Sequence, residues 1–204
     1  MTKNQIIRYT KNKVKELFKN YPVPAHGFNH VKQVRDWAIK LARAEQANLF
    51  LCEMSAWLHD VGRTLEKERD GETSLHHELS YNICQEWFKK DSILKKLPQE
   101  DKIAILYSVR YHWNNAADKF ASAIILRDAD KLDLFGYRGL KRAKQYWGAG
   151  NTRALLKATR YVFSDAFFLH TKTARAICKK EKLVEPIKKF HLQLLKKQIK
   201  KVSL

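Results

Sequence analysis

The sequence has few residues of the kinds that break helices or cross-link chains. Its 204 residues include seven glycines, four prolines and three cysteines. β-Sandwiches and barrels need many turn residues, so the scarcity of glycine and proline favours long helices. Cys52, Cys84 and Cys178 are odd in number and form no CxxC pair. Their spacing argues against a disulfide framework or a zinc ribbon and predicts a reducing compartment.

Long apolar runs are also missing. No stretch approaches the roughly 18 uncharged apolar residues of a membrane span, and the basic N-terminal segment has no apolar core of signal-peptide length. We therefore expect a cytoplasmic protein. Hydrophobic residues make up 45% of the chain and aromatic residues 11%, a composition that excludes disorder. The length predicts one domain over residues 1–204.

Positive charge is abundant. The chain has 40 Lys and Arg residues against 21 Asp and Glu residues, which gives a net charge of +19. Such a field attracts polyanions and leaves a nucleic-acid partner open. The lysine pairs are scattered, however, and most alternate with apolar residues at helical spacing, as on a solvated helix face. No RNP-like motif, KH-type loop or Cys/His finger spacing is present. Alternatively, the field steers small phosphorylated substrates.

Apolar residues recur at helical spacing along most of the chain, and turn residues separate the segments. We predict helices over residues 2–19, 49–61, 121–134 and 137–147. Three others are predicted with less definite bounds: one begins at 28 or 29 and runs past 41, one runs from a cap at 73 or 74 to about 88, and one runs from 98 to about 113. Two or three more helices follow to the end of the sequence. The charged residues 62–73 are predicted to form a loop. The predicted fold class is therefore all-α, a single-domain helical bundle.

Histidines and carboxylates occupy distinctive positions on these helices. His30 lies in the first turn of the second helix, and the pair His59-Asp60 lies near the end of the third, which is apolar almost all round. Asp128 and Asp130 lie on another strongly apolar helix. Burying a His-Asp pair is costly unless its charge is compensated. A divalent cation compensates it, since neutral imidazole and carboxylate are its natural ligands.

In this order the residues resemble the HD superfamily of metal-dependent phosphohydrolases. Its pattern is a His, then an adjacent His-Asp pair, then a distant Asp. His30 in Gly-Phe-Asn-His-Val matches the first His, and His59-Asp60 matches the doublet. Asp130 in Ala-Asp-Lys-Leu resembles the closing Asp. The resemblance implies that these four residues hold a divalent cation in a bundle of the HD-domain type.

Two further points follow from the resemblance. It covers residues 25–140, the predicted HD core, and leaves residues 141–204 as a helical C-terminal extension. Asp128 is the alternative to Asp130 as a metal ligand. A two-residue offset turns a side chain by about 200° round a helix, so only one of the two faces the metal.

Other residues form a second set of candidates. His76 and His112 match histidines of the HD proteins that hold two metals, so each is a candidate ligand of a second cation or a general acid. As an alternative, both line a cleft as hydrogen-bonding partners. Arg63, just after the doublet, and Lys131, beside Asp130, are suited to bind substrate phosphate.

The resemblance implies a metal-dependent phosphohydrolase that cleaves a phosphate ester or phosphoanhydride of a small phosphorylated molecule. A nucleotide is the first expectation, as substrate of a monophosphatase or a pyrophosphohydrolase. The alternatives are a phosphodiesterase on cyclic nucleotides or nucleic acid, and a non-catalytic module that binds nucleotide or RNA. The cofactor is a divalent cation, with Mn, Mg, Fe, Co, Ni and Zn all compatible with His and carboxylate ligands. The oligomeric state is left open.

Overall fold

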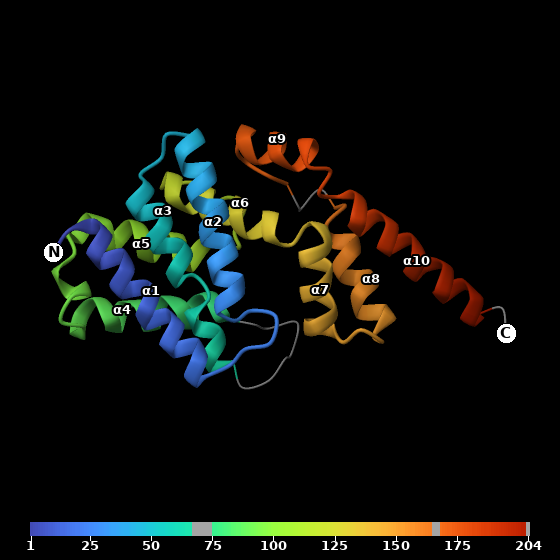
Figure 1. The fold of residues 1–204 in the computed structure, drawn as a ribbon, viewed down its shortest axis with the longest axis horizontal. Coiled ribbons are helices and arrows are strands. Elements are labelled where there is room, and N and C mark those ends of the chain that lie inside the picture. The colour runs from blue at the N-terminus through green and yellow to red at the C-terminus, as the bar shows by residue number, and fades with distance from the viewer. Residues whose placement is uncertain (67–74, 165–167, 203–204) are drawn as a thin grey trace. The chain divides into compact units, whose positions relative to one another are not determined.

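The structure, a computed structural model, describes residues 1–66, 75–164 and 168–202. It is all-α, as the sequence predicts. The described residues form ten α-helices and two short 3₁₀ helices and contain no strand (Figure 1). None of these helices combines the length and the apolar character needed to cross a membrane.

The chain divides into two compact units, Met1–Asp130 and Lys131–Leu204. The single domain predicted from the length stays a prediction. The helices of the first unit are α1 (Lys3–Asn20), α2 (Phe28–Ala44), α3 (Leu49–Leu58), η1 (Val61–Leu65), α4 (His76–Lys90), η2 (Leu94–Lys96), α5 (Gln99–Tyr111) and α6 (Ala121–Asp133), the last of which runs three residues past the division.

Helix α3 is the centre of the first unit. It packs against α1, α2 and α5. Eight of its ten residues are buried, which agrees with the apolar sequence that predicts a buried helix. The largest of them, Trp57, stacks on Phe28 of α2 with ring centroids 5.6 Å apart. Because α3 is surrounded, the residues that follow its C-terminal end are placed inside the bundle.

The C-terminal end of α3 differs from the prediction. We expected one helix to Val61, but the α-helix ends at Leu58 and the chain tightens into η1 from Val61. The apolar pattern gives no signal for the change from α-helix to 3₁₀ helix, so the helix predicted from periodicity is too long at its C-terminal end. The predicted loop over 62–73 is helical in its first four residues, and the remainder from 67 lies outside the described residues.

Several helix starts follow local capping chemistry. The Thr2 side chain and Gln5 form a reciprocal capping box at α1, and Asn48 caps α3 by accepting from the Leu51 N–H. Pro98 precedes α5, whose first turn is acidic as predicted. The predicted cap of α4 at residue 73 or 74 lies outside the described residues, and Leu75 occupies the cap position.

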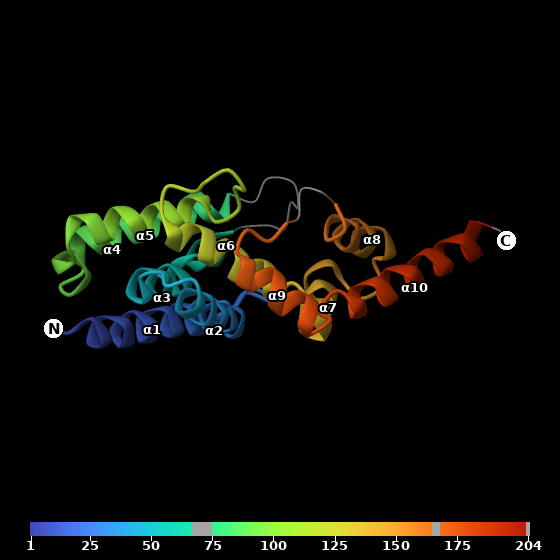
Figure 2. The same ribbon diagram turned by 90° about the horizontal axis from the view of Figure 1, so that it is seen from above.

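The second unit contains α7 (Gly136–Trp147), α8 (Thr152–Tyr161), α9 (Lys172–Lys180) and α10 (Glu185–Val202). Helices α7, α8 and α10 contact one another. In both views the C-terminal half of α10 extends beyond α7 and α8 (Figures 1 and 2). Three helices thus follow α7, within the predicted two or three.

Candidate metal centre

His30 enters the site from the start of α2. It is the third residue of the helix, and its backbone N–H donates to the Gly27 carbonyl at 2.9 Å. Its side chain is almost completely buried. The turn before it contains Ala25 at a φ of 67°, a left-handed conformation that reverses the chain after α1.

His59 and His112 are positioned in the same way by different helices. Each is the first residue after a helix, α3 and α5 respectively. The Nδ1 of His59 donates to the Ala56 carbonyl at 2.9 Å, and the Nδ1 of His112 donates to the Val109 carbonyl at 2.7 Å. A carbonyl oxygen only accepts, so Nδ1 carries a proton in each ring. Nε2 is then the atom of each ring that presents a lone pair in the neutral form.

Three residues form a first group of candidate ligand atoms: His30, His59 and Asp60. The Nε2 atoms of the two histidines lie 3.3 Å apart. Asp60 Oδ2 lies 3.4 Å from His30 Nε2 and 3.7 Å from His59 Nε2. All three side chains are buried, and the first and second elements of the predicted motif lie together; their role as metal ligands stays a prediction.

Asp60 also belongs to a second group, with His76 and His112. The Nε2 atoms of these two histidines are 3.2 Å apart, and His76 Nε2 lies 3.7 Å from Asp60 Oδ1. One carboxylate thus offers Oδ2 to the first group and Oδ1 to the second. The rings of His59 and His112 are in edge contact at 5.3 Å, so the two groups are adjacent.

The Asp60 carboxylate is held in its charged form. Burial pushes its pKa upward, but Arg63, the neighbouring His59 and the hydrogen bond with His30 outweigh this effect and hold the pKa well below 3.8. Arg63 Nε lies 3.5 Å from Asp60 Oδ1, and its Nη1 pairs with Glu66 at 3.2 Å. A charged carboxylate is the form that ligates cations.

The two histidines of the second group are held neutral. Burial lowers the pKa of His76 to about 2 and that of His112 to about 4. Both pKa values lie far below neutrality, so each ring is uncharged at physiological pH. Neutral imidazole is the form that binds a metal. The same shifts oppose a role as general acid, which needs a proton to donate near neutral pH.

Of the two candidate acids on α6, Asp130 is the one beside the histidines. Its Oδ1 lies 3.4 Å from His30 Nε2. Burial raises the pKa of Asp130, but His30 and His59 outweigh it and keep the pKa below 3.8. Asp128 is completely buried, and its position two residues earlier turns it about 200° away on the helix. Geometry therefore favours Asp130 over Asp128.

The two predicted phosphate-binding residues lie in different surroundings. Arg63 is on η1, three residues after the doublet, with its guanidinium against Asp60. Lys131 is at the start of the second unit, and its ammonium donates to the Phe168 carbonyl at 2.8 Å. The two are separated by the division of the chain, and a phosphate-binding role stays a prediction for both.

Gly62 is a positioning residue that the sequence reasoning missed. Its N–H donates to the buried Ser80 Oγ of α4 at 2.8 Å. A Cβ at this position would lie 2.3 Å from the Ser80 N and 2.5 Å from the His76 carbonyl. Only glycine lets η1 approach α4 this closely, and α4 supplies His76. The signal was present in the sequence as a glycine two residues after the doublet.

The spacing of the two groups fits divalent cations. Ligands about 2.0–2.2 Å from one ion lie about 2.8–3.6 Å from each other in tetrahedral or octahedral geometry. The distances within the two groups, 3.2 to 3.7 Å, fall within or next to this range. Asp60 Oδ1 is buried without a hydrogen-bond partner. Arg63 Nε lies 3.5 Å from this oxygen and forms an ion pair with it but no hydrogen bond, and a bound cation would supply the missing close partner.

The helical bundle and its paired His/Asp groups define an all-α protein with a candidate dinuclear metal centre. The family model "HD domain" matches residues 27–134, more than half of the chain. The chain therefore belongs to the HD domain family. This result confirms the resemblance on which the four-residue motif was predicted.

Solved structures share the fold. The chain is 22% identical to Bacillus subtilis YpgQ, crystallised in complex with ADP, with a TM-score of 0.66 and 97% of each chain covered. It is 23% identical to a predicted HD superfamily hydrolase from an uncultured Thermotogales bacterium, with a TM-score of 0.60 and 95% of this chain and 91% of that chain covered. A Bacillus thuringiensis HD-superfamily hydrolase gives 22% identity, a TM-score of 0.61 and 99% coverage of each chain. Comparison with curated proteins finds no match.

Proposed function

We propose that this protein is a metal-dependent phosphohydrolase that cleaves a phosphate ester or phosphoanhydride of a nucleotide. The observation that carries the proposal is the sharing of Asp60 between two groups of buried ligand atoms (His30 and His59 in one, His76 and His112 in the other). Asp130 lies beside the first group, with its Oδ1 3.4 Å from His30 Nε2. Membership of the HD domain family supports the same class of reaction.

The residues present suit two divalent cations. When bound, such cations stabilise the charge that develops at phosphorus and activate water for attack. The chain's own contribution is orientation. The carbonyls of Ala56 and Val109 fix the tautomers of His59 and His112. Arg63 keeps Asp60 charged and lies beside the second group, where it can also bind a phosphoryl oxygen.

A nucleotide is proposed as substrate on two grounds. The exposed Trp113 directly follows His112, and its ring contacts His77 with centroids 5.2 Å apart. An exposed indole at the rim of a phosphate-cleaving site offers a surface on which a base can stack. The second ground is the structure of Bacillus subtilis YpgQ in complex with ADP.

The test is hydrolysis by purified protein loaded in turn with Mn²⁺, Co²⁺ and Mg²⁺. Nucleoside mono-, di- and triphosphates report monoester and anhydride cleavage, and a bis-aryl phosphate reports diester cleavage. We expect turnover of a nucleotide that falls at least 1,000-fold in Asp60→Asn. The matched control is Asp101→Asn, which removes one carboxylate from the first turn of α5. Absence of turnover with every metal, or equal turnover in Asp60→Asn, overturns the proposal. Faster cleavage of the diester identifies a phosphodiesterase instead.

A further inference from the structure

The net positive charge of the chain is concentrated in its second unit. Residues 131–204 contain 19 Lys and Arg against four Asp and Glu, a net charge of +15. Residues 1–130 contain 21 against 17, a net charge of only +4. The unit with most of the charge is therefore not the one that contains the candidate metal centre. A field of this strength attracts polyanions.

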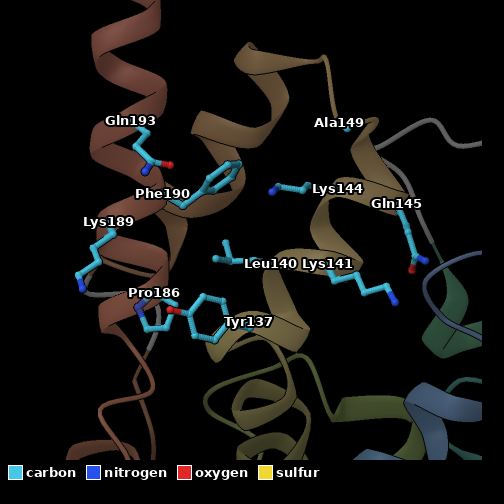
Figure 3. Close-up of a pocket in the computed structure, with 10 residues that line it drawn as sticks. All are labelled: Tyr137, Leu140, Lys141, Lys144, Gln145, Ala149, Pro186, Lys189, Phe190 and Gln193. Carbon is cyan, nitrogen blue, oxygen red and sulfur yellow. The ribbon is translucent and has the colours of Figure 1, made fainter.

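A cavity of about 530 Å³ lies in this unit between α7 and α10 (Figure 3). Its lining residues are Tyr137, Leu140, Lys141, Lys144, Gln145, Ala149, Pro186, Lys189, Phe190 and Gln193. Three of the ten are lysines, and none is an Asp or Glu. The lysines line an apolar floor without a carboxylate to neutralise them there.

The cavity combines these lysines with aromatic rings. Phe190 on α10 and Lys144 on α7 point toward each other in Figure 3, and the Lys144 ammonium lies 4.6 Å from the centre of the Phe190 ring. Tyr137 lies beside Pro186 and is 77% exposed, an unusual state for a tyrosine side chain. Lysines and an exposed aromatic ring that line one cavity are the two elements of a surface that binds single-stranded nucleic acid.

A second basic cavity adjoins the first. It has a volume of about 830 Å³, and its lining includes Arg175, Lys179 and Lys182 together with one carboxylate, Glu185. Lys189 lines both cavities. Two or three cations would be enough to bind the phosphates of a mononucleotide. Here, however, the basic side chains continue from one cavity into the next. The continuity favours a ligand with repeated phosphates.

We propose that residues 131–204 bind single-stranded nucleic acid, with backbone phosphates on Lys141, Lys144 and Lys189 and a base on Tyr137. The competing occupant is a second copy of this chain, because Leu192 and Ile199 of α10 are also exposed. In such a dimer the second units of the two copies, each with a net charge of +15, would repel each other. A polyanion has the charge that is complementary to this unit. This binding site shares no residue with the proposed phosphohydrolase centre, and the proposal does not depend on that function.

The test is fluorescence anisotropy of the full-length protein with labelled 15-mers of dT and U and with a duplex, from 50 to 200 mM salt. We expect both single strands to bind more tightly than the duplex. Comparison of the dT and U 15-mers distinguishes a preference for DNA from a preference for RNA. In the triple variant Lys141→Glu, Lys144→Glu and Lys189→Glu, affinity should fall at least tenfold. The slope of log K against log salt should decrease by about 2, at about 0.7 for each lost phosphate contact.

The control is Lys15→Glu, Lys95→Glu and Lys96→Glu, the same charge change at exposed lysines of the first unit. The slope of log K against log salt of this control variant should equal that of the parent protein. Tyr137→Ala should weaken binding at least fivefold without changing the slope, and Tyr137→Phe should restore it. No binding at 50 mM salt, equal losses in both triple variants, or an unchanged slope overturns the proposal. A triple variant that instead changes the sedimenting mass identifies the cavity as a contact between copies.

Discussion

The Nε2 atoms of His76 and His112 lie 3.2 Å apart although 36 residues separate them in the chain. The two nitrogens are at hydrogen-bond distance, and a divalent cation bound between them would be ligated by both instead. We expect about two divalent ions per chain in the parent protein, about one in His112→Gln, and none tightly held in Asp60→Asn, since Asp60 serves both groups. Elemental analysis after gel filtration measures this stoichiometry. Two ions in His112→Gln would show that the second group is not a ligand set.

The pH dependence of stability provides a second prediction. The pKa of His112 is about 4 in the folded protein, below the ordinary histidine value of 6.5. Between these values the unfolded chain binds a proton that the folded chain does not. Stability is therefore complete above pH 6.5 and decreases as the pH falls toward 4. For His112 we expect a loss of about 2 kcal/mol between pH 6.5 and pH 5, at about 1.4 kcal/mol per pH unit.

The measurement is urea unfolding of metal-free protein at a series of pH values. His112→Gln should show a shallower decrease of the unfolding free energy between pH 6.5 and pH 4, whatever its stability at pH 7. Burial lowers the pKa of His76 as well, so His76→Gln should flatten the same range. If the unfolding free energy depended on pH equally steeply in the parent and in both variants, the two histidines would not be buried in the neutral form.

The contact between Gly62 and α4 predicts a large effect from one methyl group. In Gly62→Ala the added Cβ meets backbone atoms of α4 at less than 3 Å, so the helix must shift. We expect a loss of about 2–3 kcal/mol in the free energy of unfolding, together with weaker metal binding because α4 carries His76. Gly150→Ala is the matched control, since its Cβ meets nothing within 4 Å. Equal stabilities of the two variants would show that the close approach is not required.

The three cysteines should differ in reactivity. Cys52 and Cys84 are completely buried, while Cys178 on α9 is half-buried. Burial raises the pKa of Cys52 to about 12 and raises that of Cys84 as well, which suppresses the reactive thiolate. With an aromatic disulfide reagent we expect slow labelling of Cys178 alone in the folded protein and of all three after unfolding. Rapid labelling of two thiols without denaturant would contradict this burial.

The sequence predicted the helical fold and the first part of the site because both leave local signals. Periodic apolar residues predict the helices, and the motif predicts His30, His59 and Asp60 as one set, whose ligand atoms lie within 4.8 Å of one another. The predicted end of the third helix at Val61 was wrong, because α3 ends at Leu58 and the chain continues into η1, where Gly62 packs closely against α4. Backbone contacts of this kind leave no trace in hydrophobic periodicity.

Other features of the site could not be predicted because they depend on contacts between residues that are far apart in the sequence. The contact of the Lys131 ammonium with the Phe168 carbonyl joins residues 37 positions apart. The choice between Asp128 and Asp130 needed the actual rotation of α6. The orientation of His59 and His112 had a readable signal, however. Each histidine directly follows a helix, where the last carbonyls lack partners and accept from a ring nitrogen.

The single carboxylate of Asp60 has a consequence for how the protein would take up its ions. The first ion to arrive would immobilise both oxygens and neutralise part of the charge that the second ion needs. The two sites would therefore load one after the other, with unequal affinities, and a calorimetric titration would show two steps rather than two identical, independent equilibria.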